Sequence, residues 1–305
     1  MTHEQIYAGV SDTFSAYDTL RDRSKKRGNR LYDTTQVGPS RKQAMSGDTL
    51  YSTSQWIIYP LIVLLVIAAS EAGARLTRLY RGREDIGKEL FGTLSVSSFG
   101  LLALMLGFTF AMAMTRYEER REAVLREANA IGTAVLRAQV LAEPERSESL
   151  RLLGEYARLR LGLVSVVAPS WSQQIDRSLA IQTQLWGVAV AETTKDPRSV
   201  PFGLYMQALN DVIDEHQIRI QALRNHVPSE VIVMLVLLAM TSIAFTGHDF
   251  ALGRGGRRLP ITCMAVLIGL VITLILDLDR PERGLIIDSN EPLHDLIVGL
   301  PAEAR

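Results

Sequence analysis

Charged residues are absent from four long stretches of this chain, and the segments between them are rich in charge. The four uncharged runs are 22, 26, 17 and 18 residues long and cover 49–70, 90–115, 231–247 and 259–276. An α-helix rises about 1.5 Å per residue, so about 20 residues cross the hydrocarbon core of a bilayer. The pattern therefore predicts four membrane-spanning helices.

The third and fourth runs are short enough to be buried core helices, which is the alternative interpretation. Two observations favour the membrane. These runs are joined by a short loop, HDFALGRGGRR, and charged residues flank both of them.

In the first run, Trp56 and Tyr59 are aromatic residues of the kind that settle at the headgroup level.

The segment between the second and third runs, residues 116–230, has the pattern of a helical bundle. Four prolines divide it into four helical pieces: Pro144, Pro169, Pro197 and Pro201. In the last piece, residues that are apolar except for His216 follow one another at spacings of four and three, which is typical of a helix packed along a seam. They are Phe202, Met206, Leu209, Ile213, His216, Ile220, Leu223 and Val227. We expect the second span to continue to about residue 142 and Pro228 to be tolerated as a kink. The predicted fold class is all-α, with four transmembrane helices and a central helical bundle.

The predicted organisation has five parts. They are a disordered polar extension (1–48), a first transmembrane hairpin (49–115), the bundle (116–230), a second transmembrane hairpin (231–276) and a C-terminal tail (277–305). Met45 lies just ahead of the first span. Translation of the native protein could begin there, in which case residues 1–44 would not belong to it.

Composition excludes several functions. The chain has 33 Lys plus Arg and 33 Asp plus Glu, so it lacks the excess of positive charge that nucleic-acid binding requires. The single cysteine, Cys263, excludes intrachain disulfides and cysteine-built metal sites. No nucleotide, dinucleotide, zinc or nucleophile motif is present. We therefore expect no enzyme activity, no cofactor and no nucleic-acid partner.

The second span carries two contrasting faces on a helical wheel. Small residues gather on one side and suit helix packing, with Gly92, Gly100 and Gly107 among them. The opposite line gives the candidate pore-lining residues Ser95, Ser98, Leu102, Met105, Thr109, Arg116 and Arg120. In a ring of chains this line would be a mildly polar lane that opens into a basic ring and suits anions. Glu127 lies on the same line, and its negative charge would oppose anion entry. The alternative for the Ser and Thr hydroxyl groups is that they face lipid or form hydrogen bonds with their own helix backbone.

His216 is the one polar residue in the apolar seam of the last bundle helix. The simpler interpretation is a hydrogen-bonded core residue, and the alternative is a pH sensor. The neighbouring Asp211, Asp214 and Glu215 have no matching Glu and His pair on another helix, so no metal site is expected.

Three separated stretches carry a resemblance to a known family. They are LMLGFTFAMAMTRYEERREAVLREANAIGTAVLRAQVLAEPER, QALNDVIDEHQIRIQALRNHVP and ILDLDRPERGLI. They resemble the bestrophin-like family of bacterial four-span membrane proteins, and the likeness covers about residues 56–300. The family is distantly similar to bestrophins, so the resemblance implies a pentameric anion channel whose second span lines the pore. A true bestrophin carries an acidic calcium clasp after its last span. Here Asp277, Asp279, Glu282 and Asp288 are interspersed with Arg280 and Arg283 and do not form an acidic cluster, so calcium gating is not expected.

Two functions are therefore predicted as alternatives. The first is a homo-oligomeric channel for an inorganic anion such as chloride, located as a multi-pass protein in the inner (plasma) membrane. The second is a membrane-anchored helical sensor or scaffold without transport activity. Lys and Arg are denser in the two short loops, which favours an extracytoplasmic bundle, whereas the resemblance implies a cytoplasmic one.

Overall fold

The computed structural model of the chain describes residues 55–79, 87–163, 171–195, 198–252, 259–280 and 289–304. All of them belong to the second of two compact units, Leu50–Arg305. The extension predicted to be disordered, 1–48, lies outside the described residues.

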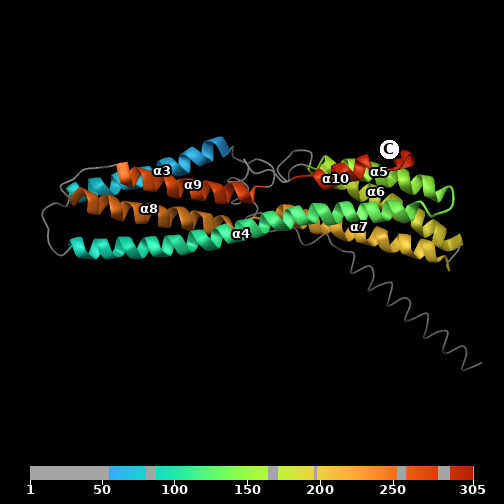
Figure 1. Ribbon diagram of the computed structural model, residues 1–305, viewed down its shortest axis with the longest axis horizontal. Helices are drawn as coiled ribbons and strands as arrows, with labels where there is room; N and C mark the ends of the chain where they lie inside the picture. The colour runs from blue at the N-terminus through green and yellow to red at the C-terminus, as the bar shows by residue number, and fades with distance from the viewer. Residues whose placement is uncertain are drawn as a thin grey trace, which may run out of the picture. The chain divides into compact units, whose positions relative to one another are not determined.

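Every regular element in these described ranges is helical (Figure 1). The elements are α3 (Gln55–Leu79), α4 (Gly87–Ala138), α5 (Glu145–Leu161), α6 (Trp171–Lys195), α7 (Val200–Arg224), α8 (Ser229–Leu252), α9 (Leu259–Asp279), α10 (Glu291–Val298) and the short 3-10 helix η1 (Ala302–Ala304). The predicted all-α fold is confirmed. Four candidate membrane spans lie on α3, α4, α8 and α9, and α5, α6 and α7 fall between the second and third of them.

The four membrane helices share one apolar core. Helix α3 packs against α8 and α9, and the first half of α4 packs against the same two helices. Helices α3 and α8 cross closely, because a Cβ atom on Gly73 would collide with the carbonyl oxygen of Ala244, and one on Gly247 would collide with that of Ser70. Small residues at both crossing points allow this approach, as is common between helices in a membrane.

The bundle has a second core, formed by the remainder of α4 with α5, α6, α7, α10 and η1. The C-terminal segment, predicted as a tail, contributes to it: Leu293 and Leu300 are buried there. A Cβ atom on Gly154 would collide with the carbonyl oxygen of Ala304, so η1 lies directly on α5. Residues 289–304 are therefore folded onto the bundle.

Helix α4 joins the two cores without interruption over 52 residues, ending at Ala138, slightly before the predicted residue 142. The connection from α7 to α8 differs from the expected kinked helix. Residues 225–228 are not helical, and the backbone N–H of Val227 donates to the carboxylate of Asp279 at 2.9 Å. Pro228 disfavours helical backbone in the residue before it, and the Asp279 side chain supplies Val227 with an acceptor outside the helix.

Candidate functional site

One face of α4 packs against other helices of the same chain, and we call it the covered face. It consists of Ser95, Leu102, Thr109, Arg120 and Glu127. Leu102 and Thr109 are each 1% exposed, and Leu102 belongs to the core that α8 and α9 complete. The hydroxyl oxygen of Ser95 lies 3.2 Å from that of Thr246 on α8.

The predicted pore-lining residues of the membrane segment lie on the covered face or at its border. Ser98 and Met105 are half-buried. The Ser98 hydroxyl donates to the carbonyl oxygen of Ser95 at 2.8 Å, and the Thr109 hydroxyl donates to that of Met105 at 2.7 Å. These hydroxyl groups therefore bond their own helix, which was the alternative considered. The predicted pore-lining residues therefore face other helices of the same chain, whereas residues that line an open pore would be exposed.

The two arginines of the predicted line also separate from each other. Arg116 is half-buried and pairs with Glu119, one turn later, at 2.9 Å. Arg120 is 2% exposed and donates to the carbonyl oxygen of Leu278, at the end of α9, at 2.6 Å. Arg120 thus joins α4 to α9, and in this position its charge does not contribute to an exposed basic ring.

The opposite side of α4 has few contacts within the chain, and we call it the uncovered face. It consists of Val96, Gly100, Leu104, Gly107, Phe108, Glu118, Glu122, Leu125 and Leu136. Val96, Leu104 and Phe108 are 75%, 54% and 64% exposed. A Cβ atom on Gly92, Gly100 or Gly107 would meet no atom of the described residues within 4 Å, so these glycines do not pack against the helices that the structure describes. Their predicted packing role stays a prediction about contacts with another chain.

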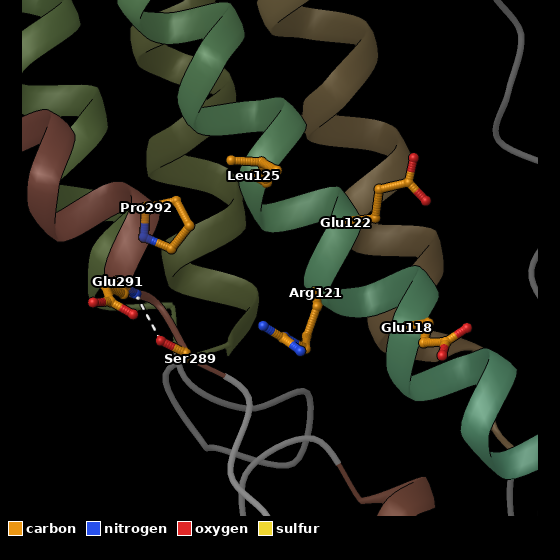
Figure 2. Close-up of a pocket in the computed structure, with 7 residues that line it drawn as sticks. All are labelled: Glu118, Arg121, Glu122, Leu125, Ser289, Glu291 and Pro292. Carbon is orange, nitrogen blue, oxygen red and sulfur yellow. Dashed lines mark hydrogen bonds between the residues drawn. The ribbon is translucent and has the colours of Figure 1, made fainter.

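Charged residues lie on the uncovered face just beyond the membrane segment. Glu118, Arg121, Glu122 and Leu125 line a surface pocket of about 370 Å³ together with the start of α10. Figure 2 shows Arg121 and Leu125 directed toward Ser289 and Pro292, whereas Glu118 and Glu122 point away from α10. The uncovered face therefore presents two carboxylates free of α10 at this level.

A cluster of ionised side chains is buried in the bundle at the far end of the covered face. Arg160 of α5 donates from Nε to Glu127 Oε1 at 2.6 Å, and Arg219 of α7 donates from Nη1 to Glu127 Oε2 at 2.7 Å. All three side chains are between 0% and 2% exposed. Burial opposes ionisation of Glu127, but the two guanidinium groups outweigh it and hold the pKa of Glu127 below its usual value.

His216, the candidate sensor, belongs to the same cluster. Its Nδ1 lies 3.1 Å from the hydroxyl group of Tyr156, which also accepts a hydrogen bond from Gln182 Nε2 at 3.1 Å. Burial, with Arg160 and Arg219 adding to the effect against Glu127, lowers the pKa of His216 to about 4. The side chain is therefore neutral near pH 7, as expected of a hydrogen-bonded core residue. A sensing role stays a prediction, and the pKa places its response well below neutral pH.

The sequence did not predict the contacts that Tyr59, Asp277 and Asp279 make where the two cores join. The Tyr59 hydroxyl donates to Asp277 Oδ1 at 2.6 Å, and Asp279 holds the α7–α8 connection. Arg160 and Arg219 were also missed, because each partner of Glu127 comes from a distant helix. Within the described ranges, no group of three His, Cys, Asp or Glu side chains is placed to hold a metal ion.

Comparisons with known proteins agree with this architecture. The profile described as the Bestrophin-like domain matches residues 60–287. A crystal structure of a bacterial bestrophin homolog from Klebsiella pneumoniae, carrying one substitution, is similar with a TM-score of 0.59 at 15% identity, covering 80% of this chain and 98% of that one. A second structure of a bacterial bestrophin homolog from this species gives 0.57 at 14% identity, covering 79% and 99%. At these identities the likeness shows the fold. None of the curated proteins compared with the chain matches it.

Proposed function

Because the chain belongs to the bestrophin-like family, we propose that it assembles as a ring of identical chains that conducts small ions around α4. The observation that supports this proposal is the uncovered face. Only 17% of the most apolar part of α4 is buried within the chain, against 33–44% for the other three spans. Helix α4 is therefore the span with the most surface left for a pathway and for neighbouring chains.

Beyond the charged residues that follow the membrane segment, the uncovered face again carries exposed apolar side chains. Leu125 and Leu136 are 47% and 65% exposed and lie in the bundle half of α4. Exposed apolar side chains that line up along one helix face are typical of a surface that binds protein. We propose that this partner is a second copy of the chain, because a neighbouring copy in the ring would lie along both the membrane half and the bundle half of α4.

We further propose that the uncovered face, and not the covered face, borders the pathway. Leu104 and Phe108 would then form its apolar constriction. The predicted preference for anions rested on Arg116 and Arg120, and Arg120 is engaged by Leu278. On this side of α4 the exposed carboxylates of Glu118 and Glu122 are balanced by the exposed guanidinium groups of Arg121 and Arg126, and Arg126 donates to Glu122 at 3.3 Å. These exposed charges therefore favour neither cations nor the anions predicted from the sequence.

Purified protein in liposomes tests the proposal. We expect electron microscopy of the detergent-solubilised protein to show a ring with α4 innermost, and we expect the liposomes to pass ions. The Phe108→Ala variant would widen the constriction and increase the flux. A monomer that passes no ions at any voltage or pH would refute conduction and favour the membrane-anchored sensor or scaffold.

Reversal potentials under a salt gradient test which face borders the pathway. The Glu118→Gln/Glu122→Gln variant leaves Arg121 and Arg126 without balancing carboxylates, so its selectivity should shift toward anions relative to the unaltered protein. Glu148→Gln is the matched control, because Glu148 is an exposed carboxylate on α5 rather than on α4. Unchanged selectivity in the double variant would contradict the assignment of the uncovered face to the pathway.

A further inference from the structure

The guanidinium group of Arg160 is completely buried, yet only one of its three nitrogens has a hydrogen-bond partner. Nε donates to Glu127, whereas Nη1 and Nη2 are inaccessible to solvent and have no acceptor among the residues that the structure describes. Nε of Arg219 is in the same condition. Buried donors on a charged group nearly always have an acceptor, so these nitrogens require an explanation.

The cluster also has an excess of positive charge. Arg160 and Arg219 each carry one positive charge, because arginine keeps its proton in proteins, and Glu127 carries one negative charge. Among the described residues, the other side chains that contact them are Tyr156 and Asn290, and both are uncharged. The net charge of this buried group is therefore one positive unit. Isolated charges in a protein interior are strongly disfavoured unless they are paired.

We propose that the bundle binds one small monovalent inorganic anion, such as chloride, against Nη1 and Nη2 of Arg160. An anion with one negative charge would neutralise the excess positive charge of the cluster. The two outer nitrogens of a guanidinium group can donate together to a single atom, such as chloride, or to a small planar anion. Arg219 shares Glu127 with Arg160, and its Nη1 also donates to the carbonyl oxygen of Arg160. Complete burial of Arg160 excludes a carboxylate from another macromolecule. The site is in the bundle and does not depend on the conduction proposed above.

Thermal unfolding of the full chain in detergent is the first test. The apparent Tm is measured in sodium chloride and in sodium gluconate at equal ionic strength and pH, since gluconate is too large for an enclosed site. A ligand that binds only the folded state raises Tm in a saturable way. We expect a rise of roughly 3–5 °C when chloride exceeds its Kd tenfold.

Two variants connect the effect to the site. Arg160→Gln removes the proposed donors and should abolish the difference between chloride and gluconate. Arg151→Gln is the matched control, because Arg151 is an exposed arginine on the same helix, paired with Glu148 and Glu155. It should keep the full chloride dependence.

Crystals of the unaltered protein grown in sodium bromide provide a test that needs no variant. A bromide anomalous peak in contact with Arg160 supports the proposal. The absence of such a peak overturns it, because the nitrogens are then satisfied by water alone or the anion that raises Tm lies elsewhere. Equal Tm values in chloride and gluconate overturn it as well.

Discussion

Replacing Glu127 with Gln tests the buried cluster most directly. The change keeps the shape of the side chain but removes the one negative charge that two buried guanidinium groups share, at 2.6 and 2.7 Å. Breaking a fully buried ion pair by removing one partner typically costs about 3–5 kcal/mol, because the remaining charge is left uncompensated. In Glu127→Gln two such charges remain, so we expect a loss at the upper end of that range.

The assay is thermal unfolding of the detergent-solubilised chain at pH 7. For a domain of this size, each kcal/mol corresponds to roughly 2–4 °C, so the apparent Tm should fall by about 10 °C or more. Glu148→Gln is the control, since an exposed pair of this kind contributes about 0–1 kcal/mol and its loss should barely move Tm. A Glu127→Gln variant that unfolds within about 2 °C of the unaltered protein would refute the reasoning that these charges are desolvated and paired.

Three further outcomes are expected from thermal unfolding of the detergent-solubilised chain. Gly73→Leu should prevent α3 and α8 from approaching and should strongly destabilise the membrane core, whereas Gly100→Leu, on the uncovered face, should leave the fold intact; equal Tm values for the two variants would contradict the close crossing. The pKa of His216 is about 4 in the folded chain and about 6.5 when unfolded, so its contribution to stability is complete above pH 6.5 and is lost as the pH falls toward 4; His216→Gln should remove that part of the pH dependence, and an unchanged Tm profile would show that His216 does not titrate with folding. Leu293→Ala should cost about 2–5 kcal/mol, because the side chain is 0% exposed in the bundle core, and a neutral result would show that α10 is not part of that core.

The fold could be predicted because it follows from patterns that are local in the sequence. The uncharged runs determine the membrane helices, and the alternation of four and three residues in α7 identifies the buried side of that helix. Leu209 and Ile220 are buried there as expected. The helical wheel also grouped Ser95 and Arg120 correctly on one side of α4.

The direction in which that side faces could not be predicted. A line of Ser, Thr and Arg is typical of a surface exposed to water, but here it faces the chain's own helices. The reason is that its charges are satisfied by groups far away in sequence, Arg120 by Leu278 and Glu127 by Arg160 and Arg219. His216 was detectable as the one polar member of an apolar seam, whereas Arg219 lies beside the seam and carried no such signal. Partners on other helices become evident only when the helices are packed.

The unbroken backbone of α4 has a mechanical consequence. At about 1.5 Å per residue its 52 residues span roughly 78 Å, and no proline interrupts them. A rigid rod of that length converts a small tilt into a large displacement: inclining the membrane end by about 5° would carry the opposite end sideways by roughly 7 Å. Because the second half of α4, up to Ala138, is part of the bundle core, a tilt of the helix within the bilayer would displace the bundle together with it.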